Sequence, residues 1–192
     1  MAKKQKKKVN PRRIPMPKSA LDKDAILSEA MQDDMYRAWL LVVNALVEQE
    51  QIPLAEIPEL ADTVNQYVSK ASFRGKSRDI EMAKAERLMG IPNPYEHLNP
   101  DAIKSEVELA RFKEKVFKVA THMALCVICL GLEATGRFQK ENLRRLFFHV
   151  DLTLAEIDGG HNSYQEIEEY LSARMVTIEI DDGEYSSVNI EI

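Results

Sequence analysis

The sequence predicts a mainly α-helical protein that ends in a β-hairpin. Only seven glycines occur in 192 residues, and the long stretches between Gly and Pro positions are rich in Ala, Leu, Glu, Lys, Arg and Met, which favour helices. Apolar residues in these stretches recur at helical spacing. From residue 176 onward the pattern changes to strict alternation, which is typical of strands.

Residues 1–18 are predicted to form a disordered basic arm. They contain eight Lys or Arg residues, three prolines and no acid, so they lack the apolar surface that a core requires. The bases that we consider for binding are Lys3, Lys4, Lys6, Lys7, Lys8, Arg12 and Arg13. Such a cluster favours salt-sensitive contact with nucleic acid or an acidic partner, and the alternative is a solvating tail. The arm has no aromatic residue to stack on bases.

Residues 19–92 are predicted to form a first unit of three helices. A long helix is expected at roughly 20–50, with Ser19 as its N-cap. Pro58 then begins a second, strongly amphipathic helix. Ser77 is expected to cap a short third helix, which Gly90 closes.

Residues 93–175 are predicted to form a second unit with the same order of long, medium and short helices. The long helix is expected to start at Pro100 and to end at Gly131 or Gly136, with Phe117 on its buried apolar stripe. The medium helix spans Phe138 to Leu154 and ends at a Gly-Gly pair, and the short one starts at a Ser163–Glu166 capping box and ends near Met175.

An internal repeat supports this division, because the two units align without gaps at a constant shift of 86 residues. The aligned pairs are Ala38 with Ala124, Leu46 with Leu132, Ile57 with Leu143, Leu60 with Leu146, Val64 with Val150, Val68 with Leu154, and Ser77 with Ser163. Identities are few, so chance similarity between amphipathic helices is the alternative to a duplication.

Residues 176–192 are predicted to form a β-hairpin. Val176, Ile178 and Ile180 alternate with polar residues, Asp182-Gly183 supplies a turn, and the alternation resumes to Ile192. A lone hairpin is marginally stable. We therefore expect its aliphatic face to cover the helices or to contact a second chain.

Composition places the protein in the cytoplasm. The N-terminal segment lacks the apolar region of a secretory signal, and the apolar run at 123–132 is about half of what a membrane span requires. The net charge is −5 and the pI is near 5.5, which argues against a protein built wholly to coat nucleic acid. Residues 156–192 hold ten acids and one base, which indicates either a surface for a basic partner or a solvated face.

One group of residues has the chemistry of a metal site. His122, Cys126 and Cys129 lie at i, i+4 and i+7 on one helix face, and His149 is a conceivable fourth ligand. The cysteines, however, lie in an apolar run where free Cys packs as a small hydrophobe. The sequence favours core packing, so no metal and no cofactor is predicted.

The loop at residues 158–162 is the other candidate, since Asp158, two glycines and His161 together suggest a catalytic or phosphate-binding loop. It follows a helix, however, and turn chemistry explains all of it except His161. No nucleotide-binding, metalloprotease or hydrolase motif occurs, and the four histidines at 97, 122, 149 and 161 are scattered. We therefore predict no catalytic residues and no enzyme.

The segment Lys7-Lys8-Val9-Asn10-Pro11-Arg12-Arg13-Ile14-Pro15, with the helix and the Pro-initiated helix that follow it, resembles small uncharacterised helical proteins of phages and prophages of Gram-positive bacteria. The resemblance covers about the first 70 residues and brings no activity or site residues. It implies an accessory protein of a mobile element that binds a host or phage macromolecule, and an anti-defence inhibitor is one such role. The alternative is a regulator that binds nucleic acid through its basic arm. A homodimer is compatible with the hairpin.

Overall fold

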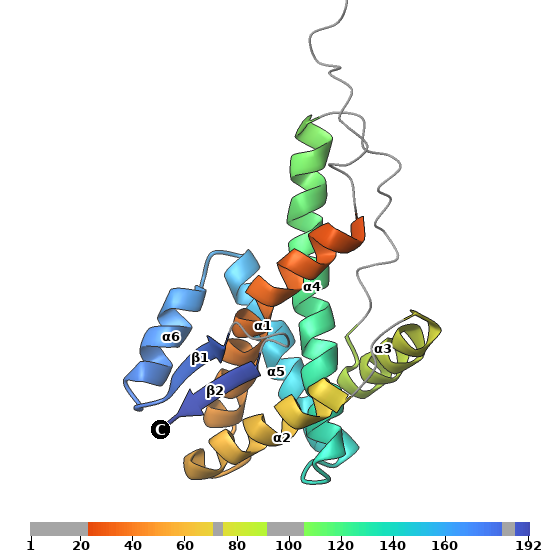
Figure 1. Cartoon of the computed structure of the whole chain (residues 1–192). Helices are drawn as coiled ribbons and strands as arrows, with labels where there is room; N and C mark the ends of the chain where they lie inside the picture. Colours follow the sequence, from red (N-terminus) through yellow and green to blue (C-terminus); the bar gives the residue numbers. More distant parts are fainter. Residues whose placement is uncertain (1–22, 71–74, 92–105, 182–186) are drawn as a thin grey trace, which may run out of the picture.

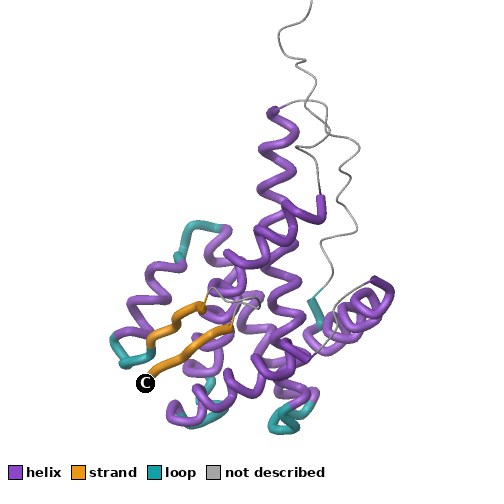
Figure 2. The backbone as a smooth tube through the Cα atoms, viewed as in Figure 1, coloured by secondary structure: helices purple, strands orange, loops and turns teal. Residues whose placement is uncertain are grey.

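The computed structural model describes residues 23–70, 75–91, 106–181 and 187–192, which form a helical bundle with a C-terminal antiparallel hairpin, as predicted (Figures 1 and 2). The basic arm and the start of the long helix expected at Pro100 lie outside these residues. The elements are α1 (Lys23–Glu48), a 3₁₀ turn η2 (Leu54–Glu56), α2 (Ile57–Lys70), α3 (Gly75–Met89), α4 (Glu106–Ala134), α5 (Lys140–Asp158), α6 (Tyr164–Ser172), β1 (Thr177–Asp181) and β2 (Ser187–Glu191).

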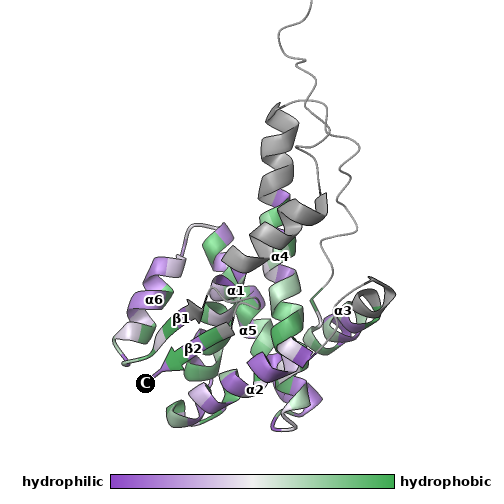
Figure 3. Ribbon diagram, viewed as in Figure 1, coloured by the Kyte–Doolittle hydropathy of each residue, from purple (hydrophilic) through white to green (hydrophobic). Residues whose placement is uncertain are grey.

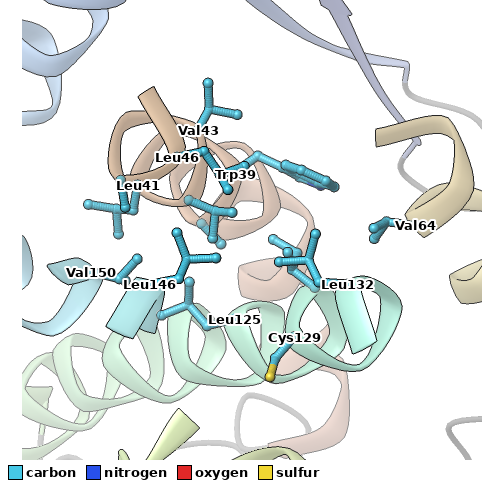
Figure 4. Close-up of a cluster of buried hydrophobic side chains, with 14 of the residues drawn as sticks. Trp39, Leu41, Val43, Leu46, Val64, Leu125, Cys129, Leu132, Leu146 and Val150 are labelled. Carbon is cyan, nitrogen blue, oxygen red and sulfur yellow. The ribbon is translucent and has the colours of Figure 1, made fainter. Parts of the chain in front are cut away.

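The two long helices, α1 and α4, pack on each other and form the centre of the molecule. Trp39 and Leu46 of α1 are buried with Leu125 and Leu132 of α4, and side chains of α2 and α5 complete this cluster (Figure 4). Hydrophobic residues lie along the part of α4 that is inside the bundle, whereas much of α6 and α2 is hydrophilic (Figure 3). Burial of this apolar surface is the main force that holds the helices together.

The helical spacing of apolar residues in the two medium helices predicts that six side chains are buried: Leu60, Val64, Val68, Leu146, Phe147 and Val150. The structure confirms five of them. Leu60 and Val64 of α2 and Leu146, Phe147 and Val150 of α5 are all buried. Val68 was expected in the same set, but it is only half-buried, because it lies near the end of α2 at the rim of the core.

Local chemistry fixes most helix ends. Ser163 caps α6 as predicted: its Oγ accepts the N–H of Glu166 at 3.2 Å, and its hydroxyl donates to the Glu166 carboxylate at 2.9 Å. Gly90 and Gly160 follow α3 and α5 with φ of 78° and 71°, a left-handed conformation that costs glycine little.

Two predicted boundaries were wrong. Ser77 does not cap α3, because that helix already begins at Gly75. The last helix ends at Ser172 instead of near Met175. There the chain turns with φ of 62° at Met175, and the N–H of Val176 donates to the carbonyl of Leu171 at 3.1 Å, which closes the helix early.

The hairpin covers the helices, as the lid interpretation predicted. Ile178 pairs with Ile190 and Ile180 with Val188 in its register, and Val188 and Ile190 are buried. Figure 1 shows the hairpin between α6 and α2, and it contacts α1 as well. Asn65 of α2 holds the outer edge of β2, since its amide donates to the Val188 carbonyl at 2.7 Å and accepts the Val188 N–H at 3.3 Å.

Several features recur at the shift of 86 residues. The corners that follow α1 and α4 both contain a residue with positive φ, Glu50 at 49° and Gly136 at 69°. The N–H of Gln49 donates to the Ala45 carbonyl at 3.1 Å, and in the second corner the same hydrogen bond runs from Thr135 to Gly131 at 3.2 Å. The packing is reciprocal too, because α1 contacts α5 and α6 while α4 contacts α2 and α3.

Candidate functional site

A cavity of about 500 Å³ opens between α4 and α5, beside the start of α6. Phe117, Thr121, His122 and Leu125 of α4 lie on one helical stripe along its wall. Asp151, Leu154, Ala155 and Asp158 of α5 form a second stripe at i, i+3, i+4 and i+7 on the opposite wall. The site is therefore built from two regular helices, so its walls are fixed by the core beneath them.

Arg37 of α1 lies at the edge of the cavity between two aromatic rings. Its guanidinium carbon is 5.9 Å from the centre of the Phe117 ring and 5.4 Å from the centre of the Tyr164 ring. Its Nη1 atom is 3.2 Å from Oδ1 of Asp34, whose side chain is fully buried. Cation–π contact and the ion pair together fix the position of this arginine.

The other charged groups of the cavity come from facing helices. Lys118 Nζ of α4 is 2.7 Å from Oδ2 of Asp158 of α5, which ties the two walls together. Asp151 is exposed and forms no salt bridge in the described part of the chain. With Arg37 and Lys118 both paired, the carboxylate of Asp151 is the cavity charge that has no counter-ion among the residues that the structure describes.

His122 and Thr121 are the buried polar residues among those that line the cavity, and His122 is the one that can titrate. Its burial lowers its pKa from 6.5 to about 4, so the imidazole is neutral at pH 7. Oε1 of Glu86 lies 3.6 Å from its Nε2 atom and would favour the protonated ring, but desolvation dominates because the side chain is only 7% exposed. A neutral ring here adds a polar atom to the wall without adding charge.

The structure does not bring the four residues of the conceivable metal site together. Cys126 and Cys129 are fully buried in the core, as the packing interpretation predicted, and burial raises the pKa of both thiols, that of Cys129 to about 12. His122 Nε2 is 3.6 Å from the Cys126 sulfur, whereas Nδ1 of His149 lies 3.8 Å from Oε2 of Glu48. No group of three or more potential ligands is assembled among the described residues.

The loop after α5 is a helix ending, as the turn interpretation predicted. Gly160 has a positive φ, and the N–H of His161 donates to the carbonyl of Glu156 at 2.9 Å. Asp158 is engaged by Lys118, and His161 is exposed. The seven bases of the arm, Lys3, Lys4, Lys6, Lys7, Lys8, Arg12 and Arg13, and also His97 lie outside the described residues.

Sequence reasoning missed the exposed apolar residues around the cavity. Phe117 was expected on the buried stripe of α4, yet it is 41% exposed, because it faces the cavity, whereas its neighbours Val116 and Val119 on another face of the helix are buried. Phe148 and Leu152 of α5 are 59% and 46% exposed and lie one helical turn apart, close to the stripe that lines the cavity. Their i, i+4 spacing off the buried face was a signal in the sequence. No signal in the sequence predicted the contact of Arg37 with Tyr164.

Two further features of the described residues bear on function, one on the surface and one in the core. The acids Glu166, Glu168, Glu169, Glu179 and Glu191 are exposed, so the acidic character of the C-terminal third is a surface property. In α4, residues Lys115–Ala134 are long and apolar enough to span a membrane by length and composition, but 78% of the apolar window in this stretch is buried inside the fold. That burial is what a core helix shows.

No family model, no curated protein and no solved structure matches this chain. The resemblance of residues 7–15 to phage proteins therefore stays a prediction.

Proposed function

We propose that this protein acts without catalysis, by binding another macromolecule through the surface around the α4–α5 cavity. The observation that carries the proposal is the exposure of Phe117, Phe148 and Leu152 on the two helices that form the cavity. Exposed large apolar side chains next to a concave site are typical of protein–protein contact surfaces. Aromatic side chains contribute most of the contact energy in such surfaces.

The polar groups of the cavity support binding over catalysis. The two cations pair with neighbouring carboxylates, Arg37 with Asp34 and Lys118 with Asp158. The hydroxyl of Thr121 donates to the backbone carbonyl of Phe117 at 3.1 Å, so it satisfies its own helix. These groups hold the walls in place and leave the apolar surface as the part that is free to recognise a partner.

The biological setting that we propose is that of an accessory protein of a phage or mobile element inside a bacterium, with a host or phage protein as the partner. The resemblance of residues 7–15 and of the helices that follow supports this setting. An inhibitor of a host defence protein is one function of this kind.

Capture of the partner tests the proposal. Tagged full-length protein is incubated with lysate of a Gram-positive host, beside a Phe148→Ser/Leu152→Ser double variant and an Ile80→Ser control, in which the changed residue is 67% exposed on α3. We expect the wild type and the control to retain the same protein and the double variant to lose it by about tenfold or more, which corresponds to about 1.4 kcal/mol. Equal capture by all three, with unchanged melting temperatures, would remove this surface as the binding site.

A second candidate function is a regulator that binds nucleic acid, and the composition of the arm favours it: residues 1–18 hold eight bases and no acid. Counter-ion release makes such binding steeply salt-dependent. The measurement is the affinity for a DNA duplex and for an RNA across a salt series, with and without residues 1–18. Affinity that does not depend on the arm or on salt would contradict this function.

A further inference from the structure

The hairpin covers a surface of the first unit, residues 19–92. The α4–α5 cavity lies at the corresponding position of the second unit, residues 93–175, after the shift of 86 residues. The shift of 86 residues places Asn65 on Asp151 and Tyr36 on His122. In the first half, Asn65 binds the backbone of Val188 in β2, and Tyr36 lies beside β1 at the wall of a small groove. In the second half, Asp151 and His122 both line the open cavity.

The surroundings of the two positions agree as well. Burial and the neighbouring carboxylate of Glu168 of α6 raise the pKa of the Tyr36 hydroxyl to about 12. His122 lies 3.6 Å from Glu86 of α3, which is the third helix of the other half. Ile91 lines the edge of the cavity, and the shift places it on Thr177, the first residue of β1. The cavity therefore corresponds to a strand-docking surface.

On this basis we infer that the cavity binds an extended, strand-like segment of the partner, in which aliphatic side chains alternate with basic ones. The inference rests on the proposed function and specifies its partner. Asn65 both donates to and accepts from a strand backbone, but the carboxylate of Asp151 can only accept, so it selects a backbone N–H or a cation. Leu154 and the exposed ring of Phe117 offer an apolar wall on which aliphatic side chains pack.

Charge decides the rest of the partner's chemistry. Arg37 and Lys118 are neutralised within the protein, while Asp151 has no salt bridge among the described residues. A Lys or Arg on the bound segment forms an ion pair with the Asp151 carboxylate, whereas a Glu or Asp would be repelled by it. The volume of about 500 Å³ lies in the usual range of binding cavities, roughly 300–1,000 Å³.

The test uses fluorescein-labelled peptides and fluorescence anisotropy with the full-length protein. The probe alternates Val or Ile with Lys or Arg. One control peptide has the same composition with the aliphatic residues grouped at one end, and a second has Glu in place of every base. The protein variants are Asp151→Lys, which reverses the charge of a carboxylate that has no salt bridge in the described part of the chain, and Ala155→Trp, which fills the cavity from an exposed position. The matched control is Asp62→Lys, a charge reversal at an exposed position of α2.

We expect the alternating probe to bind the wild type and the Asp62→Lys control equally, and both cavity variants about tenfold or more weakly. Both control peptides should bind at least tenfold more weakly than the probe. Binding that the two cavity variants leave unchanged, equal binding of the grouped peptide, or no binding of the probe at about 1 mM overturns the inference. If partner capture nevertheless depends on Phe148 and Leu152, the proposed function stands and only the strand-like partner is excluded.

Discussion

The protonation of His122 connects a single residue to the stability of the whole fold. Burial lowers its pKa from 6.5 to about 4, so the unfolded chain binds a proton there more readily than the folded chain does. Above pH 6.5 the imidazole is largely neutral in both the folded and the unfolded chain, so the lowered pKa of His122 has little effect on the free energy of unfolding. As the pH falls from 6.5 towards 4, the unfolded state gains protons first, and the folded state loses stability.

We therefore expect His122 alone to lower the free energy of unfolding by about 2 kcal/mol between pH 7 and pH 5. Urea denaturation at the two pH values, followed by circular dichroism, measures this difference in the wild type and in His122→Gln, which keeps a polar group without a titration. The comparison isolates His122 from the carboxylates, which both proteins share. An identical pH dependence in both would show that the ring is protonated or exposed in the native state.

The two cysteines lead to a second prediction at this scale. Because Cys126 and Cys129 are fully buried and burial raises the pKa of both thiols, the thiolate form that reacts with electrophiles is scarce and shielded. We expect neither thiol to react with a thiol reagent in the native protein at pH 8, and both to react in denaturant. Counting modified thiols by mass spectrometry before and after unfolding gives the answer. Fast native labelling of either cysteine would contradict the core position.

The residues of the cavity show how far sequence reasoning reaches. Burial of Cys126 and Cys129 could be predicted because their apolar neighbours are adjacent in sequence. The position of Arg37 between Phe117 and Tyr164 could not, because these three residues come from three different elements and no local pattern encodes their proximity. The same holds for the pair of Lys118 and Asp158.

The packing of α2 on α4 depends on Gly131. A Cβ atom added there would lie 2.6 Å from Cγ1 of Val64, so the two helices approach too closely for a larger residue. In the first half of the chain the equivalent position is Ala45. We expect Gly131→Ala to lower the free energy of unfolding by about 1–3 kcal/mol, although alanine favours helices, because overpacking outweighs propensity.

A double-mutant cycle with Val64→Ala checks this explanation. Removing the methyl groups of Val64 makes room for the new Cβ atom, so the double variant should be more stable than the sum of the two single effects predicts. Thermal melting of the four proteins gives the coupling free energy. If the effects simply add, the cost of Gly131→Ala does not arise from contact with Val64.

Predictions at the scale of elements succeeded where the signal is local. The capping box of Ser163 and Glu166, the glycine ends and the alternating hairpin each need only a few neighbouring residues. Ser77 and Met175 were assigned wrongly, because a serine can stand inside a first turn and a methionine can take a positive φ when hydrogen bonds close the helix around it. Phe117 was assigned wrongly because helical spacing does not tell how wide a face of the helix is covered: Phe117 faces the cavity, while Val116 and Ala120 are buried.

At the scale of the whole molecule, the reciprocal packing of the two halves is the main feature that the sequence left open. The repeat of 86 residues predicted the order of the helices but not their partners. In the structure, α1 packs on α4, α5 and α6, and α4 also packs on α2 and α3. Such contacts join residues far apart in the sequence. A pattern within one helix shows which face is buried, but it does not identify the helix that covers that face.

This arrangement predicts the behaviour of the protein when it is divided. Expressed separately, residues 1–92 would expose the face of α1 that holds Trp39, Leu41 and Leu46, and residues 93–192 would expose the matching face of α4. Neither half buries enough apolar surface without the other, so neither should show a cooperative melting transition. Mixed together, the two fragments should form a one-to-one complex with the helical content of the intact chain.

Sedimentation and circular dichroism of the fragments, alone and mixed, measure both parts of this prediction. The control is Leu132→Glu in the second fragment, which places a charge in the shared core and should prevent association because a buried unpaired carboxylate costs several kcal/mol. A fragment that folds alone would mean that its own helices suffice for a core. Fragments that stay unfolded when mixed would mean that the covalent link between the halves is needed to bring α1 onto α4. The first result would rule out the view that contacts between the halves, and not those within each half, hold this fold together, and the second would show that these contacts are too weak to form without the covalent link.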